Sequence, residues 1–446
     1  MSPDVNPALR LRSIELSPEM DGREVVIAGW VQDVRNLGGI SFIQLRDRGG
    51  VVQVTAPRKK VPIEIFKALS ALPRESVIAI KGVLRANKEA RAGFEVIPSA
   101  MDVLSIADAP LPMGVIDKVG VDLDTRLNNR FMDLRREHVA AIFRIRDCLL
   151  SSCREFLSEE GFVEIHTPKI VGAGAEGGAT LFPISYFGRE AYLAQSPQLY
   201  KQSLMASGFE RVYEIAPAYR AEKSDTVRHL AEFLSLDMEM AFIKGPEDIM
   251  KMTERLTDHA MRGVEGRCAR ELALLNVTLP EQRPPFPRLS YDECISMLRA
   301  AGRDVPPGVE IDTENEKLLA ELLRTEYGAR HFFITDFPTE LKHGTFYAMR
   351  RDEDPRLTCY FDLEFDGEEL VSGGQREHRY DVLVRQIQEA GLDPSAFEFY
   401  LNAFRYGMPP HGGIGMGIER FLHVLLRLPN IRECVLFPRD RTRLVP

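Results

Sequence analysis

The sequence predicts a multidomain α+β protein in which a small N-terminal β-barrel precedes a larger domain of helices and strands. Residues 22–105 consist of short β-rich runs separated by turn residues, a spacing that is typical of a small barrel. From about Asp133, long helical patterns alternate with strands. The 446 residues correspond to two to four domains, at about 100–200 residues each. We therefore expect a barrel in residues 1–105, a linker in 106–132 and a second domain in 133–446.

Composition excludes several classes of protein. The 44% of hydrophobic and 28% of charged residues are ordinary for a globular chain and argue against a disordered or fibrous one. A net charge of −9 argues against unselective coating of nucleic acid, although a local basic groove is compatible with it. We expect neither a membrane-spanning helix nor a secretory signal, because no apolar run is long enough. The six cysteines form no CxxC pair, which indicates buried thiols in a reducing cytoplasm.

The expected elements follow the chain in order. The candidate barrel strands are EVVIAGWVQDV, SFIQLRD, VVQVTAP, VIAIKGVLRA and FEVIPSAMDVLSI. The Pro-rich stretch ADAPLPMGVIDKVG has the composition of a linker. The next segment, HVAAIFRIRDCLLSSCREFLSEEG, predicts an amphipathic helix whose apolar face includes Ile145, Leu149 and Phe156 and which ends at Gly161.

The segment FDLEFDGEELVSGGQR predicts a β-hairpin that carries several carboxylates. Asp366-Gly367 is a two-residue turn signal, which pairs Glu364 with Glu369 and places Asp362 on the same face. Opposed carboxylates repel each other, so a divalent cation with oxygen ligands is one way to stabilise them. A solvated acidic hairpin is the alternative. Ser372 joins this face only if the strand bulges near Gly373-Gly374.

Two further segments carry polar groups in patterns that favour a binding site. In EFLSLDMEMAF, alternation gives one apolar face and a second face with Phe233, Ser235, Asp237 and Glu239, where a ring lies beside acids. The preceding loop carries Arg220, Arg228 and His229, and arginines bind phosphate oxygens in a fixed fork. An exposed ring and solvated loop arginines are the plain alternatives.

The segments SPQLYKQSLMASG and HGGIGMGIERFLHVLL complete the candidate features. Ser196 and Pro197 predict a helix start, with Gln198 and Lys201 on one face of its first turn. A lysine there opposes the helix dipole, so it is either a tolerated surface residue or a partner for a ligand carboxylate. The glycines before Glu419 and Arg420 allow close approach of backbone to a ligand, but they match neither GxGxxG nor a Walker A motif.

Together and in this order, the segments resemble class II aminoacyl-tRNA synthetases of subclass IIb, specifically the aspartyl-tRNA synthetases of the archaeal type. FVEIHTPKI is similar to the family's motif 1 (near 162–171), with Pro168 at the dimer interface. YRAEKSDTVRHLAEFLSLDMEM is similar to motif 2 (near 212–242), and GGIGMGIER is similar to motif 3 (near 412–428). The resemblance implies an anticodon-binding OB-fold followed by a catalytic antiparallel sheet flanked by helices.

The resemblance also implies an activity and a set of site residues. The activity is ATP-dependent ligation of L-aspartate to the 3′ end of tRNA(Asp), through aspartyl-adenylate, by a cytoplasmic homodimer that uses Mg²⁺. Arg220 and Arg420 are the implied catalytic residues. ATP would be bound by Arg220, Glu222, Arg228, His229, Phe233, Glu369, Gly417 and Arg420. L-aspartate would be bound by Glu176, Gln198, Lys201, Asp237, Ser372 and Arg376. The metal ligands would be Asp362, Glu369 and Ser372. The anticodon would contact Arg35, Phe42, Gln53 and Glu95.

Three rival functions are weighed against this one. Asparaginyl-tRNA synthetases share all three motifs, but this chain has Lys201 in SPQLYK and the segment FPRD, and a neutral amide would leave Lys201 and Arg376 facing no anion. The tRNA-independent asparagine synthetase related to this family lacks the N-terminal barrel. A non-catalytic RNA-binding paralogue would lack the arginines of motifs 2 and 3. Gln32 and Arg91 fit neither pattern associated with charging tRNA(Asn), so the tRNA scope stays open.

Overall fold

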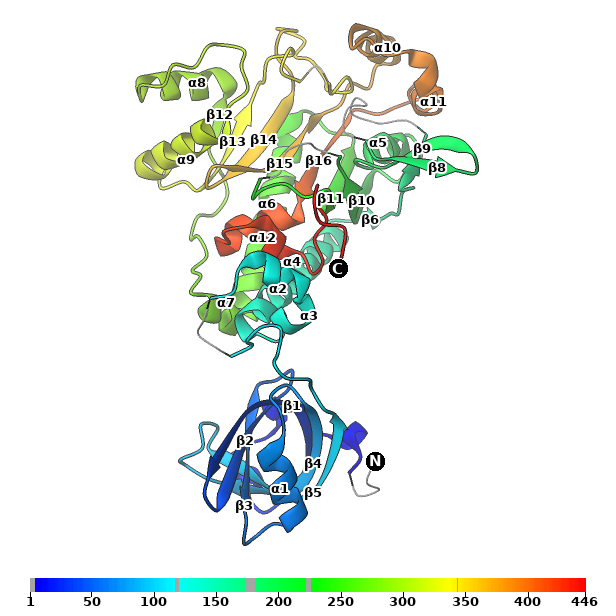
Figure 1. Ribbon diagram of the computed structural model, residues 1–446. Helices are drawn as coiled ribbons and strands as arrows, with labels where there is room; N and C mark the ends of the chain where they lie inside the picture. Colours follow the sequence, from blue (N-terminus) through cyan, green and yellow to red (C-terminus); the bar gives the residue numbers. More distant parts are fainter. Residues whose placement is uncertain (1–4, 117–119, 173–180, 222–225, 343) are drawn as a thin grey trace. The chain divides into compact units, whose positions relative to one another are not determined.

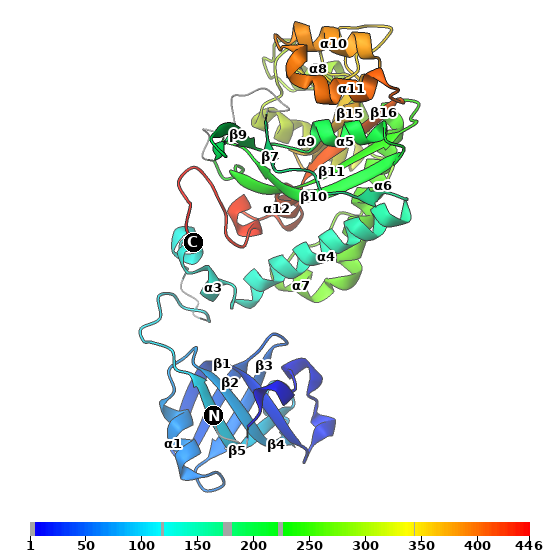
Figure 2. The ribbon, with the colours of Figure 1, turned by 90° about the vertical axis from the view of Figure 1, so that its right-hand side faces the viewer.

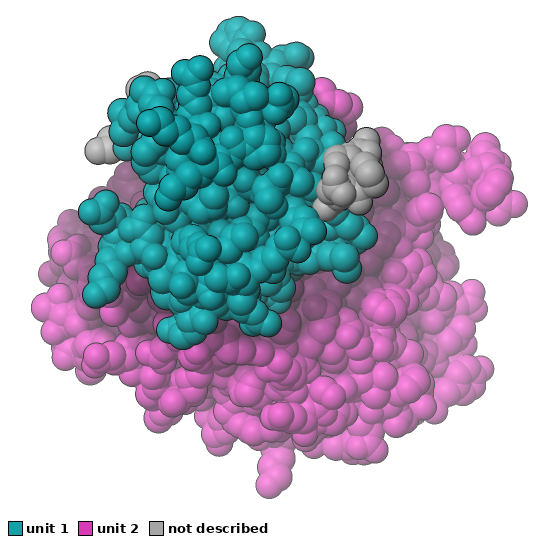
Figure 3. All heavy atoms as spheres, turned by 90° about the horizontal axis from the view of Figure 1, so that it is seen from below, with its two compact units in different colours: residues 1–136 teal, residues 137–446 magenta. Residues whose placement is uncertain are grey.

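Figure 1 shows the chain as two units, residues 1–136 and residues 137–446, each with a hydrophobic core of its own. Figure 3 distinguishes the same two units by colour. This computed structural model describes residues 5–116, 120–172, 181–221, 226–342 and 344–446.

The first unit is a closed five-stranded barrel, as the spacing of β-rich runs predicted. Its strand order is β1-β2-β3-β5-β4, and one helix, α1, lies between β3 and β4. Alternating residues such as Ile43, Leu45 and Val54 face the core, because successive side chains of a strand point to opposite faces. The elements are β1 (Glu24–Leu37), β2 (Ile40–Arg46), β3 (Val51–Pro57), α1 (Ile63–Ala71), β4 (Val77–Ala86) and β5 (Phe94–Ser105).

The stretch expected to be a linker contains two short helices, α2 (Leu123–Asn128) and α3 (Arg130–Asp133). The buried Asp133 carboxylate accepts hydrogen bonds from Arg126 (3.0 Å) and Arg130 (2.6 Å). Composition alone did not reveal these helices, because buried ion pairs between a few residues leave no hydrophobic period in the sequence.

The second unit is built on an eight-stranded, mainly antiparallel sheet with the order β12-β13-β14-β15-β16-β11-β10-β6. This confirms the antiparallel sheet that the resemblance implied. The strands of the sheet are β6 (Val163–Glu164), β10 (Arg211–Tyr219), β11 (Glu232–Ala241), β12 (Arg288–Ser290), β13 (His331–Thr335), β14 (Tyr360–Phe365), β15 (Glu368–Gln375) and β16 (His411–Gly417). A separate small sheet contains β7 (Ile170–Val171), β8 (Pro183–Tyr186) and β9 (Arg189–Leu193).

Helices cover both faces of the central sheet (Figure 2). The apolar face packs against α4, α6 and α12, whose side chains share one core with the sheet. The predicted amphipathic helix is α4, and Gly161 follows it with a φ of 78°. The helices are α4 (Glu137–Glu159), α5 (Gln198–Met205), α6 (Pro246–Arg267), α7 (Ala269–Leu275), α8 (Tyr291–Ala300), α9 (Thr313–Tyr327), α10 (Tyr380–Glu389), α11 (Glu398–Arg405) and α12 (Ile418–Leu426).

Strand alternation gives the central sheet one apolar and one polar face. On β11, Leu236, Met238 and Met240 enter the core, whereas Asp237 and Glu239 are on the opposite face. Phe242 departs from the prediction: it follows the strand with a φ of 58° and is 69% exposed. The chain leaves the sheet at that residue, so the alternation no longer applies to it.

The acidic hairpin forms with the predicted pairing, Glu364 opposite Glu369. Asp366 and Gly367 have φ values of 50° and 79°, as a two-residue turn of the primed type requires. The strand bulges between Glu369 and Val371, earlier than Gly373-Gly374, the position considered as the condition for Ser372 to join this face. This bulge places Ser372 opposite Asp362, on the same face as Glu369.

The two primed turns, Asp366-Gly367 and Phe187-Gly188, provide a matched test of packing at the acidic hairpin. Gly367→Ala should lower the free energy of unfolding more than Gly188→Ala, although the two glycines have nearly equal φ values of 79° and 78°. The left-handed conformation costs each variant about 1–2 kcal/mol. A Cβ at Gly367 would also lie 2.7 Å from Lys317 Cα on α9, whereas nothing lies within 4 Å at Gly188. Urea unfolding of both variants measures the difference, and equal losses would contradict it.

Candidate active site

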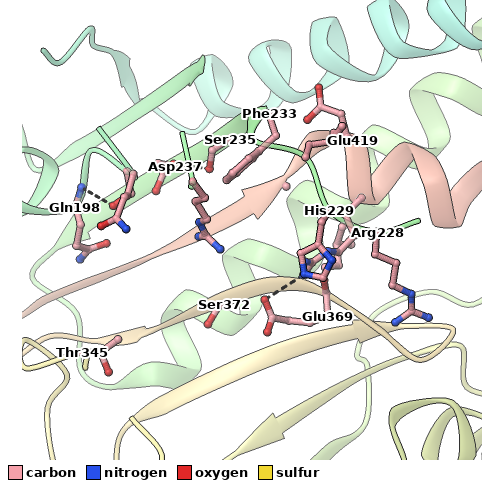
Figure 4. A pocket seen from close by; sticks show the side chains of 18 of the residues that line it. Gln198, Arg228, His229, Phe233, Ser235, Asp237, Thr345, Glu369, Ser372 and Glu419 are labelled. Atoms are coloured by element: carbon pink, nitrogen blue, oxygen red, sulfur yellow. Dashed lines mark hydrogen bonds and ion pairs between the residues drawn. The ribbon is translucent and has the colours of Figure 1, made fainter. Parts of the chain in front are cut away.

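The polar face of the central sheet carries a pocket of about 290 Å³. Figure 4 shows Phe233, Ser235 and Asp237 in a row along β11, with Glu369 and Ser372 across the cavity. Among the residues implied to bind ATP, L-aspartate or a metal, those that line the pocket are Gln198, Arg220, Arg228, His229, Phe233, Asp237, Glu369, Ser372, Arg376, Gly417 and Arg420. Lys201 and Asp362 are buried behind its wall. Glu176 and Glu222 lie outside the described residues.

One end of the pocket is formed where β10 and β11 meet the motif 2 loop. The Arg220 guanidinium lies over the Phe233 ring, 5.2 Å from its centroid. The backbone N–H of Arg220 donates to the carbonyl of Ala231 (2.9 Å), which fixes the last rung of this strand pair. A cation and a half-buried aromatic ring therefore lie side by side at the rim.

Residues 226–232, the returning limb of the motif 2 loop, follow the same rim. His229 Nδ1 and the Thr226 hydroxyl are 2.6 Å apart. Arg228 extends to the acidic hairpin and to α9, with Nη2 at 3.2 Å from Glu368 and Nη1 at 3.9 Å from Glu316. Two basic side chains thus lie near the acids of the opposite wall.

The acidic hairpin and α12 form that opposite wall. Arg420 donates to the Glu369 carbonyl (2.7 Å) and lies 3.3 Å from its carboxylate. Glu419, the preceding residue, faces away from solvent and accepts from the Leu234 N–H (2.8 Å) and from Arg146 (2.5 Å). Motif 3 is thereby bonded to motif 2 through the backbone of β11.

Both carboxylate oxygens of Asp362, one of the implied metal ligands, have protein partners in the structure. Oδ1 accepts from the Ser372 hydroxyl (2.6 Å), and Oδ2 accepts from Lys342 Nζ (3.0 Å). Burial opposes the charge of Lys342, but Asp362 and Glu369 together with Tyr360 outweigh this and raise the lysine pKa. Asp362 therefore orients Ser372 and Lys342, both of which line the pocket.

Further carboxyl groups surround this site. Glu364 is 2% exposed, and its Oε2 has no hydrogen-bond partner among the described residues. Burial, and then Glu316 and Glu369, raise its pKa well above the usual range. Burial and Glu369 also raise the pKa of Glu316 to about 7. No group of three His, Cys, Asp or Glu side chains in the described parts of the chain is arranged to hold a metal ion.

The other end of the pocket rests on a buried network of four charged side chains. Lys201 Nζ is 2.9 Å from Asp237 and 3.6 Å from Glu239, and it donates to the Ile414 carbonyl (2.7 Å). Arg376 Nε donates to Glu239 (3.0 Å) and Nη2 donates to the Gly413 carbonyl (3.0 Å). Burial opposes the charge of Arg376, but Glu239 together with Tyr360 and Tyr347 outweighs it and raises the arginine pKa.

Two donors at this end have no partner among the described residues. They are Nη1 of Arg376, which is 1% exposed, and Nε2 of Gln198, which is 4% exposed. Both residues line the pocket. Buried donors without acceptors are costly, so their presence in a cavity wall indicates a ligand with oxygen acceptors.

Sequence patterns missed several residues that the structure brings into the site. The strand pattern placed Glu239 on the polar face but gave it no role, and its spacing of two from Asp237 was the available signal. Lys342 and Ile431 lie in irregular segments and line the pocket, but no motif marked them. The helix at SPQLYK begins at Gln198, one residue later than expected.

The residues implied to contact the anticodon gather on the outside of the barrel. Phe42 is half-buried and pairs with Arg35 on β1 and with Thr55 on β3. Gln53 Nε2 donates to Glu95 (3.1 Å), and the Thr55 hydroxyl donates to the same carboxylate (2.5 Å). Phe42 has the outward parity of β2, because Ser41, Ile43 and Leu45 are the buried ones. It is therefore a surface ring and not part of the barrel core.

Comparisons with known proteins agree with this geometry. A family model described as class II tRNA synthetases (D, K and N) matches residues 122–441, and a model of the OB-fold nucleic acid binding domain matches residues 25–104. No helix in the described residues is both long and apolar enough to cross a membrane.

Individual relatives cover nearly the whole chain. The aspartate–tRNA(Asp) ligase of Thermococcus kodakarensis is 52% identical over 97% of this chain and 99% of that protein. The aspartate–tRNA(Asp/Asn) ligase of Methanopyrus kandleri is 52% identical over 97% and 98%. Among solved structures, asparaginyl-tRNA synthetase from Pyrococcus horikoshii with asparaginyl-adenylate has a TM-score of 0.92 at 35% identity, covering 98% of this chain and 99% of that one. The chain belongs to the class II tRNA synthetases of the D, K and N group.

Proposed function

We propose that the protein ligates L-aspartate to the 3′ end of tRNA(Asp), using ATP and passing through aspartyl-adenylate. The observation that carries this proposal is Arg376, a buried cation in the pocket wall whose Nη1 lacks a partner among the described residues. A side-chain carboxylate of the substrate supplies the missing acceptor. The names of relatives that are about half identical over nearly the whole chain support the same substrate.

In the first step, the aspartate α-carboxylate attacks the α-phosphorus of ATP, the bond to pyrophosphate breaks, and aspartyl-adenylate forms. We assign the adenine ring to Phe233 and the α-phosphate to Arg220, which lie together at the rim. The substrate ammonium group is assigned to Asp237, which lines the pocket. Catalysis in this scheme depends on positioning and charge stabilisation, because no protein nucleophile is needed.

The residues present fit a divalent cation that arrives with ATP. Mg²⁺ is commonly held by one or two carboxylates together with substrate phosphates, and it neutralises charge that develops on them. Glu369 and Ser372 line the pocket and would be the ligands, with Asp362 orienting the Ser372 hydroxyl (2.6 Å). The raised pKa of the buried Glu364 carboxyl group nearby, to which Glu316 and Glu369 contribute after burial, shows that acidic groups crowd this wall.

In the second step, the 3′-hydroxyl of the tRNA's terminal adenosine attacks the mixed anhydride and releases AMP. Among the described pocket residues we assign no general base, so the adenylate's phosphate oxygen takes the proton in this scheme. The outer face of the barrel, with Phe42 and the Gln53–Glu95 pair, is assigned to the anticodon by stacking and edge hydrogen bonds.

Asparagine is the competing substrate, because an asparaginyl-tRNA synthetase shares the fold with a TM-score of 0.92. Relatives with the names aspartate–tRNA(Asp) and aspartate–tRNA(Asp/Asn) ligase are equally similar at 52% identity, so tRNA(Asn) is a second candidate acceptor. ATP–pyrophosphate exchange with asparagine tests the amino acid. Charging of transcripts that differ only at the third anticodon position tests the tRNA.

Arg376→Lys should reduce kcat/KM for aspartate in ATP–pyrophosphate exchange by about 100-fold or more. A lysine cannot hold Glu239 and a substrate carboxylate at once in the forked geometry of arginine. The KM for ATP should change by less than about threefold, because Arg376 lies at the other end of the pocket from Phe233. Arg379→Lys is the matched control: it also pairs with carboxylates, Glu377 (2.8 Å) and Asp352 (3.0 Å), but it does not line the pocket. Equal effects of the two substitutions would overturn the assignment.

Phe42→Ala should leave aspartate-dependent ATP–pyrophosphate exchange unchanged and raise the KM for tRNA by about 5- to 150-fold. A stacked base contributes about 1–3 kcal/mol, which corresponds to this range. Because Phe42 lies on the outside of the barrel, the melting temperature should stay close to that of the parent. Ile43→Ala is the contrasting variant, since Ile43 is fully buried in the barrel core and its loss should lower the melting temperature. Normal charging by a stable Phe42→Ala protein would exclude the anticodon contact.

We also propose a homodimer that covers the motif 1 edge of the sheet. The edge strand β6 carries Val163 (43% exposed), β7 carries Ile170 (47% exposed), and the β8–β9 turn carries Phe187 (91% exposed). An exposed sheet edge with apolar side chains favours pairing with another chain, and a second copy is the occupant proposed. Light scattering at micromolar concentration should give about twice 50.4 kDa. A fully active monomer at that concentration would contradict the dimer.

A further inference from the structure

The segment FPRD, residues 437–440, distinguishes the chain from asparagine-specific relatives, but the sequence gives it no task. In the structure it lies beside residues 226–232, the returning limb of the motif 2 loop. The Ala231 N–H donates to the Arg439 carbonyl (2.8 Å), and Glu232 forms an isolated antiparallel bridge with Arg439. On its other side, the Ala231 carbonyl accepts from the Arg220 N–H (2.9 Å). Ala231 is thus held between the residue that approaches ATP and the FPRD segment.

A second attachment lies at the start of the returning limb. The 3₁₀ turn η6 (Ile431–Cys434) meets the start of the returning limb, where the Ile431 N–H donates to the Val227 carbonyl (2.9 Å). Arg432 Nη1 donates to the Thr226 carbonyl (3.4 Å). Thr226 in turn contacts His229 Nδ1 through its hydroxyl (2.6 Å). Both ends of the limb are therefore bonded to residues 431–440.

A buried ion pair joins the two attachments. Arg432 Nε lies 2.5 Å from Asp440 Oδ2, and the two side chains are 12% and 7% exposed. Asp440 Oδ1 also accepts from the backbone N–H groups of Thr442 (2.8 Å) and Arg443 (2.7 Å). Burial raises the pKa of Asp440, but Arg432 and these hydrogen bonds outweigh it and lower the pKa to about 2. The carboxylate is charged at every pH at which the enzyme would be assayed.

Along the returning limb, residues that are bonded to 431–440 alternate with residues that line the pocket. Thr226, Val227, Ala231 and Glu232 are held by residues 431–440, whereas Arg228, His229 and Phe233 line the pocket. Within residues 431–440, Ile431 is the pocket-lining residue, and neither Arg432 nor Asp440 reaches the cavity. Any effect of that ion pair on ATP must therefore be indirect, through the limb or through Ile431.

We infer that residues 431–440 form a brace that sets the position of Arg220, His229 and Phe233 for ATP, with Arg432 and Asp440 as the positioning residues that close it. The inference rests on the function proposed above, because it assigns ATP to these pocket residues. Their placement matters, since a displacement of about 1 Å at a reacting centre can cost about 100-fold in rate.

The experiment compares Asp440→Asn with Asp440→Glu in the full-length protein. Asp440→Asn removes the charge, so the KM for ATP in aspartate-dependent exchange should rise about tenfold or more, while the KM for aspartate changes by less than about threefold. Asp440→Glu keeps the carboxylate, so its KM for ATP should lie between those of the parent and Asp440→Asn. The Arg432→Ala, Asp440→Ala double variant should raise the KM for ATP little more than either single substitution, because the two partners act as a unit.

Glu254→Gln is the matched control for a purely structural role. Glu254, on α6, is 3% exposed and forms an ion pair with Arg288 (2.5 Å). It does not line the pocket. This variant should lower the melting temperature and leave both KM values near those of the parent. If Asp440→Asn behaves like Glu254→Gln, or raises the two KM values together, the brace is wrong.

Direct ATP binding by calorimetry separates failure of the brace from failure of the proposed function. If the parent protein shows no aspartate-dependent exchange, the proposed substrate is wrong, and the calorimetric comparison of Asp440→Asn with the parent still tests the brace. Weaker ATP binding in Asp440→Asn supports the brace, and equal ATP binding overturns it.

Discussion

The site depends on one buried carboxylate, Glu239, which is fully inaccessible and lies between two buried cations. Arg376 approaches it at 3.0 Å and Lys201 at 3.6 Å. Removing such charges from water costs several kcal/mol each, so the group is stable only when every partner is present. One glycine of β16 reflects this constraint, because a Cβ at Gly413 would collide with the Glu239 carboxylate as well as with the Met238 carbonyl. The glycine-rich motif therefore leaves room for a side chain of the neighbouring strand β11 as well as for a ligand.

The same network divides the pocket into two electrostatic ends. At the end proposed to bind the amino acid, Lys201 and Arg376 are matched by Asp237 and Glu239. This leaves a fixed and nearly neutral frame in which Arg376 Nη1 has no partner among the described residues. The frame is rigid because each polar atom that it buries needs its partner in place. A substrate that brings its own carboxylate completes this frame, whereas a neutral amide adds no charge to it.

Strand periodicity made much of the site predictable, and long-range pairing made the rest unpredictable. Alternation on β11 was enough to place Asp237 on a polar face, and a two-residue turn was enough to place Glu364 opposite Glu369, as the structure confirms. The bulge at Leu370 lies a few residues before the position that the sequence suggested as a condition, because it depends on how β15 pairs with β14 and not on local sequence. Lys342 was missed for a similar reason: its role comes from contact with Asp362, 20 residues away in the chain.

At the end proposed to bind the phosphates, three described cations already have a carboxylate partner, whereas the Arg220 guanidinium lies over the Phe233 ring. Arg228 pairs with Glu368 (3.2 Å), Arg420 with Glu369 (3.3 Å) and Lys342 with Asp362 (3.0 Å). A triphosphate cannot recruit these side chains without leaving carboxylates uncompensated in a partly buried wall, where an unpaired charge is costly. Positive charge that accompanies ATP would offset this cost in the proposed reaction. This balance is the physical reason for including a divalent cation beside Glu369 and Ser372 in the proposed reaction.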